Sequence, residues 1–402
     1  MATTLPGRNN LSFIGILAFA GFLSFMSQPS AYTWGEQDMM PFLERLADPT
    51  FLENDFFTNA SVEKSPRMVF TYLIHGISYL TGLSWYQTLY IGKLLLLMSL
   101  PVLFYLVLMA LLEKYVSKVK LDKLAWVLVM GIALVVVSQD ISFVFSIAGL
   151  ATYKPVLIAN NISLLFCFIG VFLKERQYNP LLYLTFFFLG CLLHPVMGLF
   201  TIAFYFSFLI PKFKTEKVNL LSIGLTALSA ILIIRYLFAP SSELSAAEFI
   251  EYYVLERHPW HYHVPDFSHW LGNWQLFFGL MIVLMAIPLL YGLTRKKHTL
   301  TLLAAISLFA YVGAIGIQYL FIDVFPIKFM AYLGVSRYTI FAYWSLLIIW
   351  VLMISNMVTD RAGTDFPRIS FRGLSFILIN LLIIGLIYMD DPREIYSSKW
   401  DD

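Results

Sequence analysis

Charged residues are scarce in this chain of 402 residues, of which Asp, Glu, Lys and Arg make up only 13%. A soluble domain carries about 25% charged residues, whereas here 59% of the residues are hydrophobic, 17% are aromatic and the mean hydropathy is +0.75. The composition is far from that of a soluble protein and indicates an all-α, polytopic integral membrane protein.

An excess of basic charge is also missing, since 27 basic and 25 acidic residues give a net charge of +2. The chain has no Lys- and Arg-rich run interleaved with aromatic residues, which a nucleic-acid-binding surface would need. We therefore expect no nucleic-acid partner.

Cysteine is nearly absent, with only Cys167 and Cys191, and both stand inside apolar runs. Two such residues predict no disulfide framework, and we interpret them as small core residues. A cleavable signal peptide is not evident either, because the first apolar run is long and weakly preceded by positive charge. We expect that run to be a retained helix.

Long apolar runs are abundant, and about 20 apolar residues cross a bilayer. We predict about eleven transmembrane helices in a single transmembrane domain over residues 1–402. The predicted spans are 11–31, 86–112, 124–146, 155–173, 181–194, 196–210, 219–238, 273–293, 300–322, 336–358 and 374–389. The fifth and sixth are short and meet at His194-Pro195, which predicts either a tight helical hairpin or broken helices packed inside protein.

The loops between these spans sort by charge. Five of them carry the basic residues Lys114 to Lys123, Lys174 and Arg176, Lys212 to Lys217, Arg295 to Lys297, and Arg361 to Arg372. With eleven spans all five fall on one face, which the positive-inside rule makes cytoplasmic. The amino terminus is then cytoplasmic and the carboxyl terminus extracytoplasmic, in the plasma membrane or in the inner membrane if the protein is bacterial. The other face carries two long loops, 32–85 and 239–272.

Two helices are predicted inside the first of these loops. Residues 40–47 form a short amphipathic pattern, and residues 65–83 are apolar but include Arg67 and His75. A crossing at 65–83 would reverse every later loop, so we expect an interfacial or re-entrant helix there.

Acidic residues are concentrated in the same loop. Six of the 25 acidic groups in the chain fall within residues 32–55, beginning with Glu36 and Asp38. Because an ionised carboxylate is costly in hydrocarbon, this stretch must lie in water or line a wet cavity. Carboxylates in such a loop act as a base or a ligand, or they only cap helices and solvate the interface.

The order of features in this region resembles the GT-C superfamily of membrane glycosyltransferases, which use polyprenyl-phosphate-linked sugars. The features are the first apolar span, Trp34-Gly35, Glu36-Gln37-Asp38, an amphipathic helix, Asp48-Pro49, Asp55 and a second amphipathic helix. The resemblance implies that Glu36 or Asp38 is the general base for an acceptor hydroxyl, or helps to bind a divalent cation, and that Asp55 contacts substrate. It covers the first span, the first loop and the overall topology.

Histidines cluster in the second long loop, where residues 258–269 hold four of the seven in the chain. Arg257 offers a planar fork for a phosphate, and His258 and His261 can donate hydrogen bonds to the same oxygens. Alternatively His258, His261 and His263 hold a metal ion, although the prolines between them oppose regular helical spacing. A third alternative is an aromatic interfacial loop with solvated histidines.

Isolated polar residues near or inside other spans are further candidates. Lys154 and Arg337 stand at predicted outer ends of spans, where each either binds phosphate or anchors at the headgroups. Lys93 lies well inside a span, where it must pair or reach water. His194 is expected to be a packed or pore-facing group.

Together these features predict a GT-C-like glycosyltransferase that acts on the extracytoplasmic face, with a lipid-linked sugar donor and membrane lipids as partners. Two alternatives remain. Lys93, His194 and the short paired spans favour a secondary transporter, whereas the aromatic residues of the outer loops suit a noncatalytic scaffold subunit that docks a protein partner.

Overall fold

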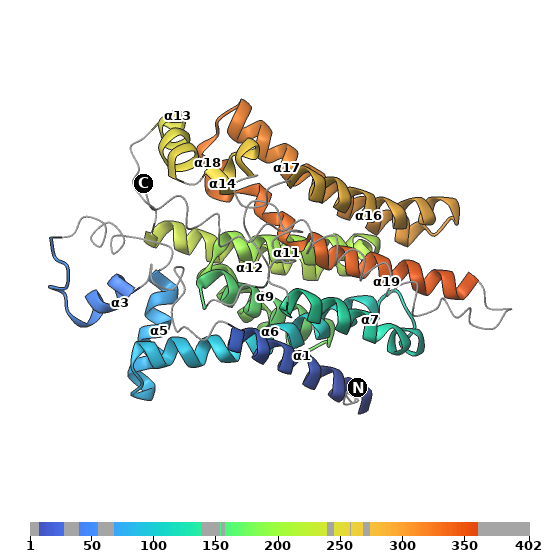
Figure 1. Cartoon of the computed structure of the whole chain (residues 1–402), viewed down its shortest axis with the longest axis horizontal. Helices are drawn as coiled ribbons and strands as arrows, with labels where there is room; N and C mark the ends of the chain where they lie inside the picture. Colours follow the sequence, from blue (N-terminus) through green and yellow to red (C-terminus); the bar gives the residue numbers. More distant parts are fainter. Residues whose placement is uncertain are drawn as a thin grey trace. The chain divides into compact units, whose positions relative to one another are not determined.

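The computed structural model describes residues 8–27, 40–54, 68–137, 153, 157–238, 245–257, 259–267 and 274–360. Every regular element within these ranges is a helix (Figure 1). The helical fold class is therefore confirmed for the described part of the chain, which falls into two compact units.

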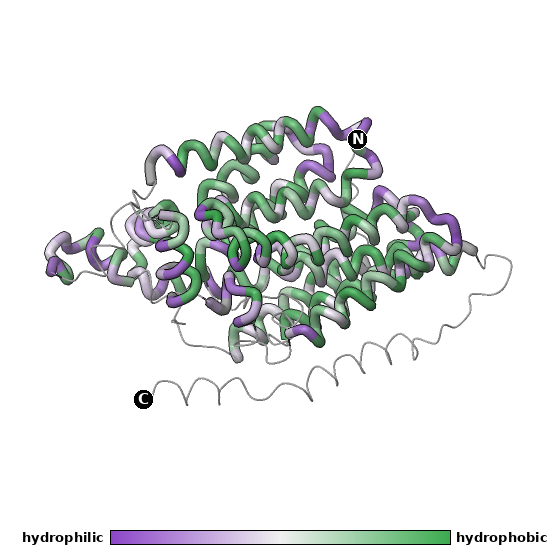
Figure 2. Tube along the Cα trace, turned by 90° about the horizontal axis from the view of Figure 1, so that it is seen from above, coloured by the Kyte–Doolittle hydropathy of each residue, from purple (hydrophilic) through white to green (hydrophobic). Residues whose placement is uncertain are grey.

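Five helical segments are long and apolar enough to cross a membrane: Trp85–Leu112, Pro195–Tyr236, Trp274–Thr294, His298–Val324 and Lys328–Val358. Figure 2 shows hydrophobic residues along most of each helix and hydrophilic residues near the ends. These segments indicate a membrane protein with several spans. The predicted last span, 374–389, lies outside the described residues.

Unit 1 consists of Met1–Ser117, Ala125–Val137 and Thr152–Glu243. Its elements are α1 (Arg8–Ser27), α3 (Met40–Ala47), α5 (Met68–Thr81), α6 (Trp85–Leu112), α9 (Ala159–Glu175), α10 (Pro180–Leu193), α11 (Pro195–Leu209), the 3-10 turn η1 (Ile210–Lys212), α12 (Phe213–Phe238) and the second part of α7 (Lys118–Val137). Helix α1 packs closely on α6 at Gly21, where an added Cβ would lie 2.1 Å from the carbonyl oxygen of Leu97.

The predicted break at His194-Pro195 is a helical hairpin. Helix α10 ends at Leu193, α11 begins at Pro195, and the His194 Nδ1 atom accepts a hydrogen bond from the Met197 N–H at 3.1 Å. An added Cβ on Gly198 would lie 2.8 Å from the Cys191 Cα, so glycine lets the two helices touch. Both cysteines are buried and free, as predicted.

The amphipathic pattern at 40–47 is confirmed as helix α3, with Phe42 and Leu43 buried. The apolar segment 65–83 contains helix α5, which buries Phe70 and Ile74 and leaves Tyr79 82% exposed. Its interfacial placement stays a prediction. Leu43 of α3 joins Phe70 and Ile74 in one core cluster with residues of α6, α9 and α10.

Unit 2 consists of Lys118–Leu124, Ser138–Ala151 and Leu244–Asp402. Its long helices are α16 (Trp274–Thr294), α17 (His298–Gln318) and α19 (Ala342–Asp360), which pack on one another. Its short elements are α13 (Ala246–Phe249), η2 (Ile250–Arg257), α14 (Pro259–Tyr262), η3 (Val264–Phe267), η4 (Tyr319–Val324), α18 (Lys328–Leu333) and η5 (Val335–Phe341). A small core of Phe249, Ile250, Val254, Tyr262, Ile322 and Ala331 joins five of these elements: α13, η2, α14, η4 and α18.

Candidate functional site

Most of the predicted site residues lie outside the part of the chain that the structure describes. These are the predicted catalytic pair Glu36 and Asp38, together with Asp55, Lys154 and His258. The structure describes the backbone of Arg257, which is the last residue of η2, but not its side chain. The side chains that the structure does describe are those of His261, His263 and Arg337.

Two predicted candidates far apart in the sequence meet in unit 2: Arg337 and the histidine-rich segment. The Nη2 atom of Arg337 donates a hydrogen bond to the Tyr262 hydroxyl at 2.5 Å, and the guanidinium lies 5.1 Å from the centroid of the Tyr262 ring. The backbone reverses at Gly334, whose φ of +55° favours glycine. An added Cβ on Gly334 would lie 3.0 Å from the Tyr262 ring, so the turn also needs the small residue.

The backbone of the histidine-rich segment is fixed by a buried amide. Gln318, at the end of α17, is 1% exposed and donates from Nε2 to the Tyr262 carbonyl at 2.9 Å. Its Oε1 accepts from the Ser336 N–H at 3.2 Å, and the Ser336 hydroxyl donates to the His261 carbonyl at 3.4 Å. Helices α14 and α17 and element η5 are thus joined at one point.

His263 forms the second polar contact of this region. Its Nδ1 atom is hydrogen-bonded to Oδ1 of Asp323 in η4, while its Nε2 atom lies 3.9 Å from Oδ2 of Asp266. The Asp323 side chain is 6% exposed and that of His263 is 26% exposed. We call Tyr262, His263, Asp323 and Arg337 the loop cluster.

Two buried atoms of the loop cluster have no hydrogen-bond partner among the described residues. They are Nε of Arg337 and Oδ2 of Asp323. Buried polar atoms are nearly always paired, because an unpaired one loses its hydration without compensation. One unused donor and one unused acceptor therefore suit this cluster to a polar ligand.

Sequence patterns did not single out Asp323 or Gln318, although Asp323 carried a usable signal as the one acidic residue between the predicted spans 300–322 and 336–358. Tyr262 was counted only among the exposed aromatic residues of the outer loops, whereas its side chain is buried. No pattern marks Gln318, because a single glutamine at the end of an apolar span is not unusual.

A metal site is not visible among the described residues, where no group of three His, Cys, Asp or Glu side chains converges. His263 bonds Asp323 instead, and His258 lies outside the described ranges. A divalent cation therefore stays a prediction.

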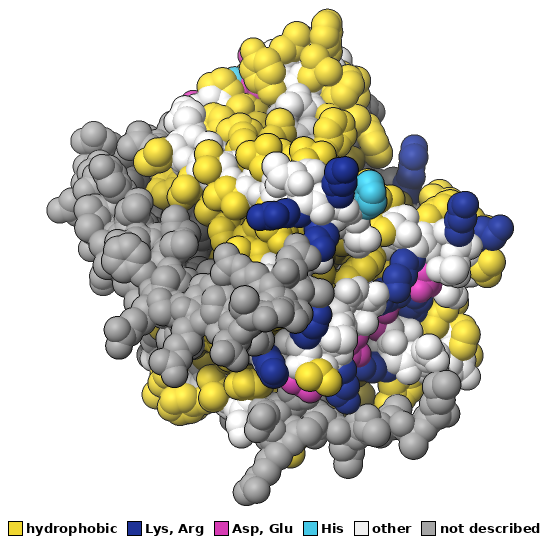
Figure 3. All heavy atoms as spheres, turned by 90° about the vertical axis from the view of Figure 1, so that its right-hand side faces the viewer, with side chains coloured by type: hydrophobic (Ala, Val, Ile, Leu, Met, Phe, Trp, Pro, Cys, Tyr) yellow, Lys and Arg dark blue, Asp and Glu magenta, His cyan; other side chains and the backbone are white. Residues whose placement is uncertain are grey.

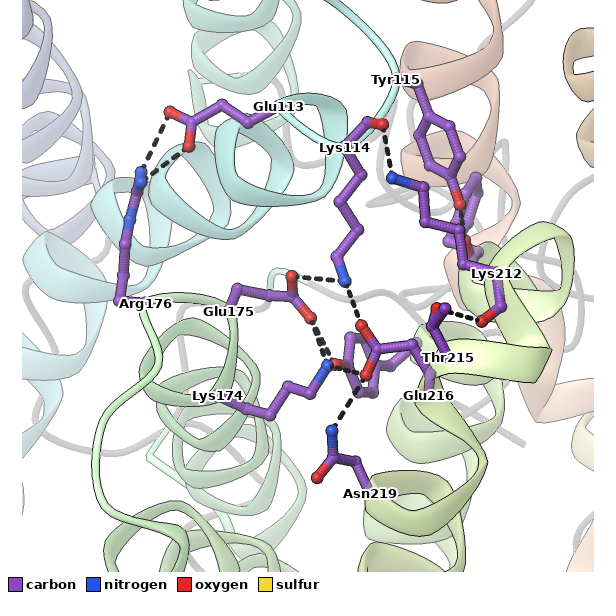
Figure 4. Close-up of polar contacts among 12 residues, drawn as sticks. Glu113, Lys114, Tyr115, Lys174, Glu175, Arg176, Lys212, Thr215, Glu216 and Asn219 are labelled. Atoms are coloured by element: carbon purple, nitrogen blue, oxygen red, sulfur yellow. Dashed lines mark hydrogen bonds and ion pairs between the residues drawn. The ribbon is translucent and has the colours of Figure 1, made fainter. Parts of the chain in front are cut away.

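A second polar cluster lies in unit 1, at Lys114, Lys174, Glu175 and Glu216, and we call it the four-charge cluster (Figure 4). The Lys114 Nζ lies 2.9 Å from both Glu175 Oε2 and Glu216 Oε1. The Lys174 Nζ lies 2.5 Å from Glu216 Oε2 and 3.3 Å from Glu175 Oε1. Each carboxylate therefore bridges both ammonium groups.

Neighbouring groups complete the hydrogen bonding of this cluster. The Asn219 amide donates to Glu216 at 3.1 Å, and the Tyr205 hydroxyl donates to Glu175. Burial lowers the pKa of Lys114, but the Glu175 charge and the hydrogen bonds to Glu216 and Glu175 raise it by more, so the net pKa lies above its usual value. The ammonium is thus held in its charged form.

The four-charge cluster brings together three of the five basic loops predicted to share one face. Lys114 follows α6, Lys174 lies in the last turn of α9, and Glu216 lies in the first turn of α12. The Lys212 ammonium also donates to the Lys114 carbonyl at 2.9 Å. On the face drawn in Figure 3, acidic side chains lie among the lysines and arginines. The full pairing of the four-charge cluster indicates that it has a structural role in unit 1.

Lys93, singled out in the sequence, is fully buried in α6 at 0% exposure. A lysine at that depth is either neutral or paired, and it lies in a different unit from the loop cluster.

No protein-family model, curated protein or solved structure matches this chain. The site's chemistry must therefore be argued from its own residues.

Proposed function

We propose that this protein is a GT-C-like glycosyltransferase that transfers a sugar from a polyprenyl-phosphate donor to an acceptor on the extracytoplasmic face. The observation that carries the proposal is the half-buried Arg337 side chain, which bonds Tyr262 through Nη2 and whose buried Nε atom has no hydrogen-bond partner among the described residues. A planar guanidinium with unused donors suits a phosphate oxygen better than a point charge does.

The proposed reaction exchanges one bond to the anomeric carbon for another. The acceptor oxygen attacks that carbon, the bond to the phosphate oxygen breaks, and its electron pair stays with the phosphate. Glu36 or Asp38 takes the proton of the acceptor hydroxyl. Arg337 stabilises the charge that develops on the phosphate, which is the main demand of such a leaving group.

The remaining predicted residues complete the proposed binding site. Arg257, His258 and His261 belong to the same segment as Tyr262 and would contact the donor phosphate. Lys154 and Asp55 would contact the sugar or its phosphate from the other outer loops.

The proposed topology has eleven spans, with the amino terminus in the cytoplasm and the carboxyl terminus outside. Its support within unit 1 is the meeting of three basic loops at the four-charge cluster, since loops of one face must lie at one end of a helical bundle. The loop cluster would then lie at the outer face.

Native mass spectrometry with lipid extraction tests this function on full-length protein purified in mild detergent. We expect a polyprenyl phosphate or its sugar ester to copurify with the wild type and to be lost from Arg337→Gln. Glu36→Gln should retain the lipid and lose turnover. Arg176→Gln is the matched control, because it removes an arginine of unit 1 that pairs with Glu113 and lies over the Phe172 ring, away from the loop cluster in sequence.

Retention of bulk phospholipid alone, unchanged by Arg337→Gln, would contradict the proposal. The transporter and scaffold alternatives would then gain weight. A stoichiometric copurifying protein would favour the scaffold.

A further inference from the structure

We propose that His263 and Asp323 form a proton-transfer dyad in which Asp323 fixes the imidazole and Nε2 of His263 exchanges a proton with a bound phosphate monoester. The hydrogen bond between His263 Nδ1 and Asp323 Oδ1 joins two side chains that are 60 residues apart in the sequence. The identity of the phosphate as a polyprenyl phosphate rests on the proposed function, whereas the dyad itself does not.

The bond to Asp323 decides which ring nitrogen of His263 is available. An ionised carboxylate can only accept hydrogen bonds, so Nδ1 must carry a hydrogen. In the neutral imidazole Nε2 is then a base, and in the charged imidazolium Nε2 is a donor. The same arrangement orients histidine in enzymes where a buried aspartate stabilises the imidazolium.

The two partners are held by different elements, which fixes their geometry. The His263 N–H donates to the Pro259 carbonyl at 2.7 Å, and the neighbouring Tyr262 carbonyl is held by Gln318. Asp323 lies in η4, the continuation of α17 directly after Gln318. The Gln318 amide therefore holds the histidine-rich segment against the helix whose continuation carries Asp323.

Two carboxylates flank the imidazole. Asp323 of η4 faces Nδ1 and Asp266 of η3 lies 3.9 Å from Nε2, while Arg337 of η5 bonds the neighbouring residue Tyr262. Asp266 is too far from Nε2 for a hydrogen bond, and its side chain is 54% exposed. It therefore leaves Nε2 open to a ligand, while its negative charge weakens the binding of an anion.

The proposed step conserves atoms and charge. When the bond between the anomeric carbon and the phosphate oxygen breaks, the electron pair remains on that oxygen. The imidazolium gives its Nε2 proton to the phosphate and becomes neutral. It regains a proton from the solvent, to which Glu36 or Asp38 releases the proton taken from the acceptor hydroxyl.

Diethyl pyrocarbonate, which acylates unprotonated imidazole nitrogens, tests the dyad without any assay of transfer. Full-length protein in detergent is treated at mildly alkaline pH, where histidine is unprotonated in general, and the modification rate of each histidine is read by peptide mass spectrometry. We expect His263 to react, and Asp323→Asn to slow its modification, because asparagine also admits the tautomer that carries the hydrogen on Nε2. His298, exposed at the start of α17, is the internal control and should not change.

Protection by a ligand tests the phosphate. Geranylgeranyl phosphate should slow the modification of His263 and leave His298 unaffected, whereas geranylgeraniol should protect neither. Asp266→Asn should strengthen the protection, because it removes a negative charge beside Nε2. His263→Asn keeps a group in reach of Asp323 but lacks Nε2, so it should stay folded and bind geranylgeranyl phosphate more weakly.

Two results overturn the inference: an unchanged His263 rate in folded Asp323→Asn, or equal protection by the phosphate and the alcohol. Protection of His263 in a protein that retains no polyprenyl lipid would uphold the dyad while the proposed function fails. Retention of such a lipid without protection of His263 would support the proposed function while the dyad fails.

Discussion

The four-charge cluster and the loop cluster are both polar and largely buried, yet they differ in how completely their atoms are used. In the four-charge cluster two lysines face two glutamates, with side chains 4–15% exposed, and each carboxylate contacts both ammonium groups. In the loop cluster Arg337 and Asp323 each keep a buried atom without a described partner. A fully paired cluster has no free hydrogen-bonding atom to offer a ligand, whereas the loop cluster keeps two such atoms among the described residues.

The difference also shows what a buried charge costs. When one member of a fully paired buried ion cluster is removed, its partners become unpaired buried charges, because their desolvation is no longer compensated. In a cluster that already has unpaired polar atoms, we expect a substitution to change ligand binding more than the free energy of unfolding. Stability measurements and ligand binding should therefore separate the two clusters.

The largest effect is expected from Glu216→Ala, which leaves Lys114 and Lys174 with one carboxylate between them. We expect the free energy of unfolding to fall by about 3 kcal/mol, in the range found when one partner of a buried pair is removed. Thermal unfolding in detergent measures the loss, and Thr215→Ala, one residue away and exposed, is the control. An unchanged melting temperature would mean that the cluster does not join the three loops.

Arg337→Gln should have a smaller effect on folding. It removes the hydrogen bond to Tyr262, and a typical bond of this kind contributes about 1 kcal/mol. The same variant should lose the copurifying phosphate lipid, so binding falls more than stability. A loss of stability as large as that of Glu216→Ala would make Arg337 a structural residue and erase the difference between the clusters.

The smallest effect is expected from Arg176→Gln. Arg176 and Glu113 form a two-pronged pair at 2.7 and 3.2 Å beside the four-charge cluster, but their side chains are 34% and 31% exposed. Exposed pairs contribute about 0.5 kcal/mol, and salt screens them. The melting temperature should scarcely move, and a large shift would show that exposure does not distinguish these ion pairs.

Local features of the fold were predictable because local physics decides them. The amphipathic pattern at 40–47 gave helix α3 with its observed bounds, and Pro195 after His194 gave a break between two short helices. Other boundaries depend on packing. The hydropathy breaks at the basic residues between the sixth and seventh predicted spans, yet the turn Ile210–Lys212 joins them into one helical segment, Pro195–Tyr236.

The candidate site was predictable only in part, for a reason of distance along the chain. The sequence marked the histidine-rich segment and Arg337 separately, since each is unusual in its own surroundings. It did not pair Arg337 with Tyr262, or His263 with Asp323, because those partners are 75 and 60 residues apart. Such pairings depend on how the helices pack, and the types of residue alone do not determine that packing.

The four-charge cluster has a consequence for biosynthesis. Its members are spread along the chain, and 102 residues separate Lys114 from Glu216. At about 5–20 residues per second, a ribosome needs roughly 5–20 s to cover that interval. Lys114 therefore emerges long before its second carboxylate, and the three loops can close on one another only once α12 has begun to be made.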